Sequence, residues 1–401
     1  MSEINIRKTF LKLRSYCESQ QFKGWDPYDG LNSRLFQAMP FSKYRLPRLA
    51  WIQLFKRSPI NLRPLVGVAK EYNAKGIGLF LHSYCNLYKN DPRDEYLARI
   101  KELGDIVLTL RSKGYSGACW GYNFDWQARA FFQPKETPTV VATTFIASAL
   151  MEAYELTKNH DYLDVAIDTQ HFILKDLNRT YDDDGDFSFS YSPLDHTQVF
   201  NASLLGSRLL SQIYTYTGDG ELLEAAKKSV AFACKHQQEN GAWAYGTLPF
   251  HQWVDNFHTG YNLECIAAYQ LHSGDYSFND AVEKGLTYYL ENFFTEEGIP
   301  KYYSNQTYPV DVHTTSQLII TLSRLDRWEE NKDLIEKVLS WTITNMQDKK
   351  GFFYYQLKKT GSSKIPYMRW AQAWMFFAFS EYFLKEKETK NEPRTKLETT
   401  N

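Results

Sequence analysis

The feature that most constrains this chain is a repeat of glycine followed by aromatic residues on alternate positions. Four copies are clear, and their glycines are 56, 57 and 53 residues apart. The copies are Gly185–Tyr191, Gly241–Tyr245, Gly298–Tyr302 and Gly351–Tyr355, with a looser first copy at Gly117–Tyr122. Each period holds two helix-sized segments, and one helical hairpin cannot bury its apolar face without neighbours. The repeat therefore predicts an array of hairpins that closes into one large domain.

Apolar residues recur at helical spacing in six stretches, which we expect to be inner helices. These stretches are about 77–90, 139–157, 199–217, 257–272, 311–326 and 367–384. Amphipathic stretches between them, expected to be outer helices, are Asp94–Arg111, Asp161–Leu177, Glu221–His236, Phe278–Phe294 and Asp333–Met346. The alternation predicts an all-α fold, an (α/α)6-type toroid of helical hairpins around a central cavity. The aromatic segments precede the inner helices, so short aromatic-rich extended pieces should lie together on one rim.

We expect three parts along the 401 residues. Residues 1–75 should form a helical, basic segment that packs on the toroid, and residues 76–384 the toroid domain. Residues 385–401 are rich in Lys, Glu, Thr and Asn and have almost nothing to bury, which predicts a disordered tail.

Composition limits the class of protein. The net charge of -1 gives no reason to expect nucleic acid as a partner. The five cysteines are scattered, without a C-x-x-C pair, which suits a reducing compartment. No run of about 18 apolar residues and no signal-like N-terminus occurs. We therefore expect a cytoplasmic protein that does not span a membrane.

The candidate chemistry lies between each aromatic segment and the inner helix that follows it. Three successive repeats place an aspartate and a histidine there, the preceding repeat adds another aspartate, and the last adds an arginine. Acid–base catalysis needs carboxyl or imidazole groups held close together with separately tuned pKa values. The catalytic candidates are Asp125, Asp255, His258, Asp311 and His313. Aspartate before a helix is also an ordinary cap, so a capping role remains open for each carboxylate.

Aromatic walls around such groups would exclude water and stack on sugar rings, as in glycoside hydrolysis. The substrate-binding candidates are Trp120, Tyr122, Trp126, Asp195, His196, Trp243, Tyr245, Trp253, Tyr261, Tyr302, Arg369 and Trp370. Hydrolysis would use Asp125, Asp255 and Asp311 as acid, base or nucleophile. β-Elimination or epimerisation of a uronic acid would instead use His258, His313 or Tyr261 for proton transfer. Arg369 would then bind the substrate carboxylate.

No cofactor or metal is expected. Three imidazoles from three repeats could bind Zn²⁺, but no H-E-x-x-H or Cys/His spacing accompanies them. The acidic run Asp182–Asp186 is similar to part of a calcium loop but lacks the rest of the ligand set. A turn with Asx hydrogen bonds is the preferred interpretation, with calcium as the alternative.

Several motifs resemble those of known toroidal families. Gln237–Trp243 fits the Q-x-x-x-G-x-W element of triterpene cyclases, and Asp255–Tyr261 is similar to the end of a protein-prenyltransferase β subunit. The cyclase D-x-D-D acid and the prenyltransferase D-x-C zinc half-site are missing, which counts against both activities. With Trp120–Gln127 and Pro366–Trp374, the chain more closely resembles six-hairpin toroid proteins associated with bacterial polysaccharide biosynthesis, over about residues 75–384. In layout it is similar to toroidal glycosidases, polysaccharide lyases and sugar epimerases.

What this resemblance implies is a carbohydrate-active enzyme that acts on a polysaccharide or a lipid-linked oligosaccharide in bacterial surface polysaccharide biosynthesis. Fold alone cannot choose between hydrolysis, elimination and epimerisation. A non-catalytic glycan-binding or scaffold subunit of an assembly system is the alternative. An isoprenoid-processing toroid is the third hypothesis, and it predicts an apolar cavity without charged pairs.

Residues 30–70 form a basic stretch without a single Asp or Glu. Its eight cations are Arg34, Lys43, Arg45, Arg48, Lys56, Arg57, Arg63 and Lys70, interleaved with aromatic and aliphatic residues. Such a stretch suits peripheral contact with an anionic membrane or with a diphosphate-linked lipid carrier. The alternative is that its apolar residues pack on the toroid as an outer helix while its cations face water.

Overall fold

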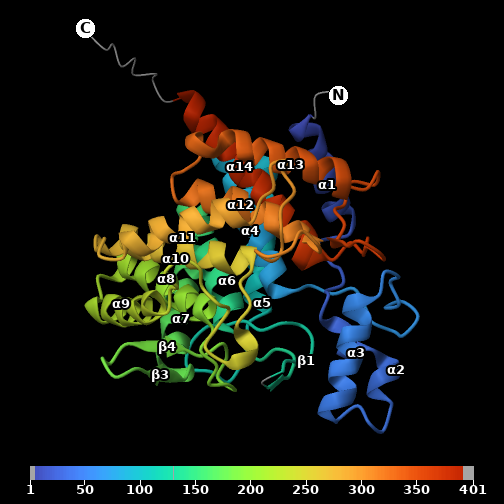
Figure 1. The fold of residues 1–401 in the computed structure, drawn as a ribbon, viewed down its shortest axis with the longest axis horizontal. Helices are drawn as coiled ribbons and strands as arrows, with labels where there is room; N and C mark the ends of the chain where they lie inside the picture. The colour runs from blue at the N-terminus through green and yellow to red at the C-terminus, as the bar shows by residue number, and fades with distance from the viewer. Residues whose placement is uncertain (1–4, 130, 392–401) are drawn as a thin grey trace.

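The computed structural model describes residues 5–129 and 131–391 and shows a toroid of paired helices (Figure 1). The inner helices are α4 (Ala74–Asn90), α6 (Val140–Thr157), α8 (Phe200–Thr217), α10 (Asn256–Ser273), α12 (Val312–Arg324) and α14 (Trp374–Asn391). The outer helices are α1 (Ile6–Ser19), α5 (Asp94–Thr109), α7 (His160–His171), α9 (Gly220–Lys235), α11 (Asn279–Asn292) and α13 (Lys332–Met346). Each inner helix packs on the next, and α14 packs on α4, which closes the ring. The predicted (α/α)6 toroid is confirmed.

Helix α1 completes this ring. Phe10 in α1 packs edge-on against Phe376 of α14, with ring centroids 5.0 Å apart. The side-chain amide of Gln347, after α13, donates to the backbone oxygen of Thr9 at 3.1 Å. The equivalent Gln237, after α9, donates to Ala281 O in the next outer helix at 2.9 Å. Helix α1 therefore holds the outer position after α13, although it lies within residues 1–75, the segment expected to pack on the toroid.

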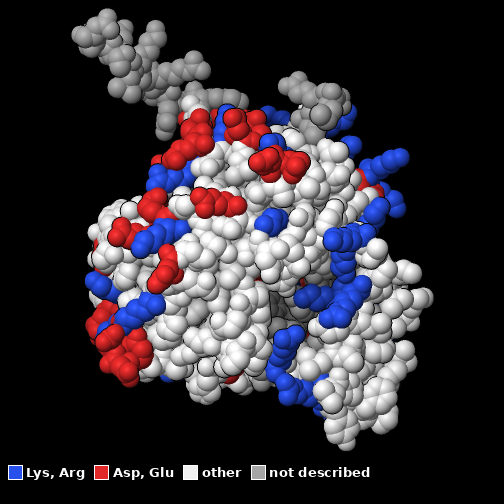
Figure 2. Space-filling model, viewed as in Figure 1, with Lys and Arg blue, Asp and Glu red and all other residues white. Residues whose placement is uncertain are grey.

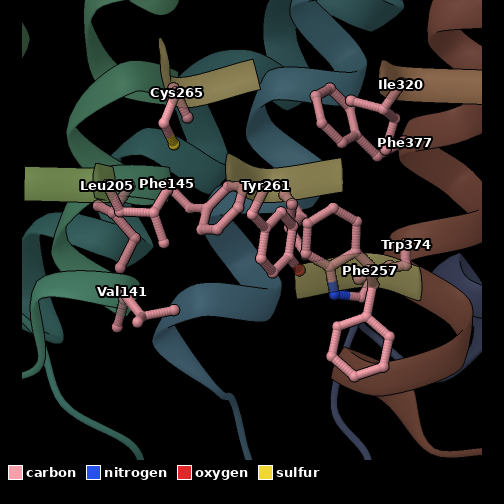
Figure 3. Packing of buried hydrophobic residues seen from close by; sticks show 14 of the residues in the cluster. Val141, Phe145, Leu205, Phe257, Tyr261, Cys265, Ile320, Trp374 and Phe377 are labelled. Carbon is pink, nitrogen blue, oxygen red and sulfur yellow. The ribbon is translucent and has the colours of Figure 1, made fainter. Parts of the chain in front are cut away.

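Inside the ring, apolar side chains from the inner helices fill the axis. Figure 3 shows Phe145 of α6, Tyr261 of α10 and Trp374 of α14 pointing toward one another. The ring of Phe145 meets those of Tyr261 and Trp374 at centroid distances of 5.7 and 5.2 Å. Deeper along the axis, Glu264 of α10 is buried against Arg324 of α12, at 3.4 Å. Side chains of the described residues therefore fill the axis of the toroid, and a cavity opens at one end of it.

The aromatic segments form short extended pieces at that end. Strands β1 (Trp126–Gln127) and β2 (Phe132–Gln133), β3 (Arg179–Tyr181) and β4 (Phe187–Phe189), and β5 (Val310–Asp311) and β6 (Gln356–Leu357) pair antiparallel. Short helical turns complete the connections at this rim, at Phe172–Asp176, Pro249–His251 and Met368–Ala373, whereas a turn at Glu329–Asn331 joins α12 to α13 at the other end. The rim of short aromatic pieces predicted from the repeat is confirmed.

Residues 30–70 form a separate lobe beside the rim, which we call the basic lobe (Figure 1). It contains α2 (Arg34–Gln37) and α3 (Arg45–Arg57), preceded by a turn at Asp29–Asn32. Its own small core is made by Leu31, Phe36 and Ile52, against which Trp51 packs. The lobe is not an outer helix of the toroid.

A buried ion pair fixes the segment before the lobe to the ring, and a second buried ion pair joins the lobe to that segment. Arg369, at the start of the last inner helix, donates from Nε and Nη2 to the two carboxylate oxygens of Asp26 at 2.6 and 2.9 Å. Arg63 donates from Nε to Asp29 Oδ1 at 2.5 Å. Because an unpaired buried charge costs several kcal/mol, these pairs hold the lobe in one orientation.

The predicted disordered tail is in part helical. Helix α14 continues through Asn391, so residues 385–391 are ordered, and the rest of the predicted tail lies outside the described residues. Lys387 donates from Nζ to the backbone oxygens of Lys89 and Asn90 at 3.0 and 2.8 Å, at the C-terminal end of α4. A cation at a helix C-terminus is stabilising, and this contact is the physical reason that the helix extends. No helix of the described residues is long and apolar enough to cross a bilayer.

The repeat glycines are required by backbone conformation, and two of them allow a matched test. Gly185 and Gly241 have φ of 82° and 90°, a region that L side chains rarely adopt. A Cβ on Gly241 would collide with the backbone oxygen of Lys284 in α11, whereas a Cβ on Gly185 would meet nothing.

We expect Gly185→Ala to lower the free energy of unfolding by about 1 to 2 kcal/mol, the cost of the left-handed backbone alone. Gly241→Ala should lower it by at least about 2 kcal/mol more, because α11 must shift. Urea denaturation followed by circular dichroism measures both. Equal losses in the two variants would contradict the close packing of Gly241 on α11.

Candidate active site

A cavity of about 670 Å³ opens at the rim, between the aromatic segments and the basic lobe. Its floor is formed by the N-terminal ends of inner helices, where Phe257, His258 and Trp370 lie. The lobe contributes residues of α3, among them Lys56 and Arg57. The cavity therefore lies at the rim, where the inner helices begin.

One tyrosine from each of four successive repeats lines the cavity. These are Tyr122, Tyr191, Tyr245 and Tyr302, the last aromatic residue of each segment. The hydroxyls of Tyr122 and Tyr191 are 3.1 Å apart and share a hydrogen bond. The corresponding residue of the fifth copy, Tyr355, is buried behind Trp370, with ring centroids 6.2 Å apart. Burial raises the pKa of Tyr245 and Tyr302, so both hydroxyls keep their protons at neutral pH.

His258 lies in the cavity wall and is oriented by a buried aspartate. Its Nδ1 is 2.7 Å from Oδ2 of Asp255, and because a carboxylate accepts, Nδ1 carries the proton. Trp253 donates its indole N–H to the same oxygen at 2.9 Å. Asp255 also caps α10, since its Oδ1 accepts the backbone N–H of His258 at 3.0 Å. Nε2 of His258 is therefore the ring nitrogen with the lone pair. The His258 side chain is partly exposed and lines the cavity.

The cavity wall is positively charged. Lys56, Arg57, Arg129, Lys358 and Arg369 line it, whereas no Asp or Glu lines it in the part of the chain that the structure describes. Figure 2 shows Lys and Arg side chains gathered along the border between the basic lobe and the toroid. Burial lowers the pKa of Lys358, and the neighbouring charges of Arg57 and Lys56 lower it further. Lys358 has no ion-pair partner among the described residues, so an anion bound beside it would relieve this repulsion.

Arg369 differs from the other cations because the fold already pairs it. Two of its nitrogens bind Asp26, and its guanidinium lies over the ring of Tyr122, with 5.0 Å between its central carbon and the ring centroid. Arg369 lines the cavity, but its guanidinium is bound to Asp26, a carboxylate of the fold itself. Its charge is therefore already balanced within the fold.

A second cluster of polar residues, around Asp311, lies beneath the floor of the cavity. Asp311 is fully buried, accepts from Trp370 Nε1 at 3.0 Å and Gln356 Nε2 at 2.7 Å, and caps α12 through the backbone N–H of His313. Burial raises the pKa of Asp311 to about 6 despite these donors. The His313 ring is stacked between Phe257 and Trp374, and burial lowers the pKa of this histidine well below its usual range. Neither side chain lines the cavity.

The candidates from the sequence divide into two groups. The structure places His258, Tyr122, Trp126, Tyr245, Trp253, Tyr302, Arg369 and Trp370 on the cavity wall. It places Asp125, Trp120, Asp195, His196, Trp243, Tyr261, Asp255, Asp311 and His313 away from the wall.

Residues away from the wall have structural contacts. The indole N–H groups of Trp120 and Trp243 donate to the backbone oxygens of Val107 and Ala233, in the preceding outer helices, at 2.9 Å each. Asp125 accepts from a backbone N–H across its turn at 2.8 Å. Asp195 similarly organises its loop, and His196 is exposed. Tyr261 is buried with its hydroxyl 3.0 Å from Nε2 of His313.

Several cavity residues were not among the candidates. Tyr28, Lys56 and Arg57 come from the N-terminal region, and Lys358 follows the last aromatic segment. The absence of acid from residues 30–70 marked the lobe as basic, but nothing in the sequence placed it over the cavity. Tyr191 could have been found, because it stands at the position of Tyr122 and Tyr245 in its own copy of the repeat.

The acidic run Asp182–Asp186 binds a lysine. The Nζ of Lys235 lies 2.9, 2.6 and 2.7 Å from carboxylate oxygens of Asp182, Asp184 and Asp186. Asp182 also accepts the backbone N–H groups of Asp184 and Asp186, which is the Asx turn preferred from the sequence. Within residues 5–129 and 131–391, no three His, Cys, Asp or Glu side chains are grouped to hold a metal ion.

Several solved structures that are similar to this chain are carbohydrate enzymes. The chain is similar to cellobiose 2-epimerase from Bacillus thermoamylovorans, with a TM-score of 0.64, 12% identity, and 95% of this chain and 100% of that chain covered. It is similar to an α-mannanase of glycoside hydrolase family 76 from Bacteroides thetaiotaomicron, with a TM-score of 0.63, 12% identity, and coverage of 81% and 89%.

A third similar structure is an unsaturated glucuronyl hydrolase specific for heparin, with a TM-score of 0.62, 12% identity, and 96% of each chain covered. The sequence matches no protein-family model and no curated protein. The likeness expected to toroidal glycosidases and epimerases is thus confirmed in the fold, while the chemistry has to be argued from this chain's own cavity.

The raised pKa of Asp311 predicts a pH dependence of stability. The folded state holds this carboxyl protonated up to about pH 6, whereas an unfolded aspartate releases its proton near pH 4. The free energy of unfolding should therefore fall, relative to that of Asp311→Asn, as the pH rises from about 4 to about 6, by roughly 2 to 3 kcal/mol. Urea denaturation of both proteins at several pH values measures this difference. A difference that does not change with pH would contradict the raised pKa.

Proposed function

We propose that the cavity binds an anionic sugar and that His258 transfers a proton at the carbon next to the sugar's carboxylate. The observation that carries this proposal is the wall itself: unpaired cations and a free histidine nitrogen, without a lining carboxylate among the described residues. The substrate class is a uronic acid within a polysaccharide or a lipid-linked oligosaccharide. The reaction is epimerisation or β-elimination.

The histidine is arranged as a general base. Asp255 holds Nδ1 of His258 in the protonated form, so Nε2 is available to accept a proton. Trp253 fixes the carboxylate in turn. A buried aspartate behind an imidazole also stabilises the imidazolium that forms when the proton is taken.

The cations provide what proton abstraction from such a carbon requires. When Nε2 of His258 takes the proton from C5 of the uronate, the electron pair of the C–H bond passes into the carboxylate group. The added negative charge is stabilised by neighbouring cations, for which Lys56, Arg57 and Lys358 are placed. A neutral sugar would have no group for these charges to bind.

The tyrosines supply a proton donor for either outcome. Tyr245 lies beside His258, with ring centroids 4.7 Å apart, and its hydroxyl has no partner within the described residues. In epimerisation a hydroxyl returns a proton to the opposite face of C5, and the proton held by His258 then passes to the tyrosinate. In β-elimination it protonates the oxygen that leaves C4, a C4–C5 double bond forms, and His258 later returns its proton to the tyrosinate.

Hydrolysis is less well supported. It needs two carboxyl groups that face the scissile bond, about 5 to 10 Å apart. Asp255 and Asp311 are buried behind Trp253 and Trp370 and are already bound by them. The cations also disfavour an isoprenoid substrate, for which an apolar cavity is expected.

Fold relatives support sugar chemistry of this kind. The solved structures with the same toroid include a sugar epimerase and an enzyme named for an unsaturated glucuronyl group.

We further propose that the protein works in the cytoplasm on a precursor of a bacterial surface polysaccharide, as the sequence resemblance implies. The competing proposal is a glycan-binding subunit without catalysis, in which Asp255 serves only as the cap of α10.

The catalytic part is tested by replacing the histidine. Incubated in D₂O with uronic-acid-containing oligosaccharides, the wild-type protein should introduce deuterium at C5 or form an unsaturated uronate, both visible by NMR. His258→Gln should lower this rate at least about a hundredfold without loss of the fold.

Asp255→Asn should lower the rate roughly tenfold to a hundredfold and change its pH profile, because the imidazole loses its orienting carboxylate. Thermal unfolding of both variants controls for the loss of the helix cap. Binding of the oligosaccharide without any exchange in the wild-type protein would favour the glycan-binding subunit instead.

The binding part is tested with adjacent lysines. Lys358 lines the cavity, whereas Lys359 is exposed and does not. Lys358→Gln should weaken the binding of glucuronate about tenfold or more and leave that of glucose unchanged, since a charged hydrogen bond is lost. Lys359→Gln is the matched control. Quenching of tryptophan fluorescence reports binding, and equal affinities of the two variants would speak against an anionic substrate.

A further inference from the structure

For its size, the basic lobe exposes more large apolar side chains than the rest of the described chain. Seven of the fifteen large hydrophobic residues that are exposed in the described chain lie between residues 35 and 65. They are Leu35, Phe41, Tyr44, Leu46, Leu54, Ile60 and Leu65. Leu46 is 77% exposed and Leu65 is 81% exposed, so these side chains gain nothing from the fold. Exposed apolar residues gathered in this way mark an interaction surface.

The packing of the lobe does not account for them. Its core is already made by Leu31, Phe36 and Ile52, which are almost completely buried. On α3, Leu46 and Leu54 are eight residues apart and both exposed, on a different side of the helix from Ile52. The helix thus has one side in the core of the lobe and another that is apolar and uncovered.

Every charged residue of the same lobe is basic. Residues 30–70 contain no Asp or Glu, and the exposed cations include Arg34, Lys43 and Arg57. Figure 2 shows uncharged side chains over the outer part of the lobe, Lys and Arg along its border with the toroid, and no acidic side chain on it. In Figure 1 the lobe projects from the toroid beside the rim.

We propose that the basic lobe docks on an anionic membrane surface. Its apolar side chains would enter the boundary between headgroups and acyl chains, and its cations would bind the anionic headgroups. A projecting surface of gathered apolar side chains, in a lobe whose charged residues are all basic, suits a bilayer, which needs no complementary shape. A protein partner would need acidic groups and pockets matched to each of these residues.

Docking in this way places the cavity at the lipid surface. Helix α3 contributes Lys56 and Arg57 to the cavity wall and Leu46 and Leu54 to the exposed side of the lobe. A glycan carried on a membrane lipid would therefore meet the cavity without leaving the bilayer. This assignment of a lipid-linked substrate rests on the proposed function, whereas the docking itself does not.

Co-sedimentation of the full chain with vesicles tests the docking. The protein should sediment with vesicles of phosphatidylcholine and phosphatidylglycerol at low salt, and only weakly with phosphatidylcholine alone. Binding should fall as salt is raised, because exposed charges are screened. Absence of binding to the anionic vesicles at low salt would overturn the proposal and leave a protein partner as the occupant of the lobe.

Matched variants locate the surface. The double variant Tyr44→Ser/Leu46→Ser removes two exposed apolar side chains and should reduce the bound fraction at least about fivefold. The control Leu271→Ser/Tyr276→Ser removes the same side chains from sites of similar exposure on the toroid. Equal losses in the two variants would show that the lobe is not the docking surface.

A further pair of double variants tests the contribution of the exposed cations. Arg34→Gln/Lys43→Gln should weaken vesicle binding about tenfold or more, whereas Lys349→Gln/Lys350→Gln, an exposed pair elsewhere, should not.

Deuterium exchange on a soluble uronate separates this proposal from the proposed function. If Tyr44→Ser/Leu46→Ser loses vesicle binding but exchanges deuterium at the wild-type rate, docking by the lobe is supported. If this variant binds vesicles as well as the wild-type protein does, the docking proposal is overturned and the proposed function still stands.

Discussion

Closure of the helical ring is the constraint on which the rest of the structure depends. Each hairpin has an apolar face that only its neighbours can cover, so α14 must meet α4 and an outer helix must follow α13. The chain meets this demand with its first helix, α1. The connection from α1 to α4, residues 20–73, is therefore an outer-to-inner connection like those that carry the aromatic segments. Because all such connections leave at one rim, the basic lobe has to lie beside the cavity.

The aspartates before the inner helices show how one sequence position takes different roles. Asp255 and Asp311 both cap helices, and both hold a tryptophan indole. Only Asp255 reaches an imidazole that lines the cavity. The difference lies in the partner, since Phe257 and Trp374 enclose the ring of His313, whereas the cavity reaches His258. A capping role and a role in proton transfer are compatible in Asp255, because each uses a different carboxylate oxygen.

Much of the architecture could be predicted because helical periodicity and turn glycines act locally. Apart from α1, which was not predicted as an outer helix, the inner and outer helices lie where the spacing of apolar residues indicated. The candidate site was predicted less well. Alternating aromatics show that a segment has two faces, but not which face is turned to the core, so Trp120 and Trp243 were expected on the cavity wall and instead anchor the rim to outer helices. The pairing of Arg369 with Asp26 could not be foreseen, since 343 residues separate them.

The sequence by itself determined the ring, the rim and the charge of residues 30–70, because these follow from period, glycine positions and composition. Only the tertiary structure decided which side chains share the cavity. Lys56 and Lys358 come from opposite ends of the chain and meet because the ring closes. Burial follows from that packing as well, and burial decides that Asp311 is a structural carboxyl and that His258 remains open to a ligand.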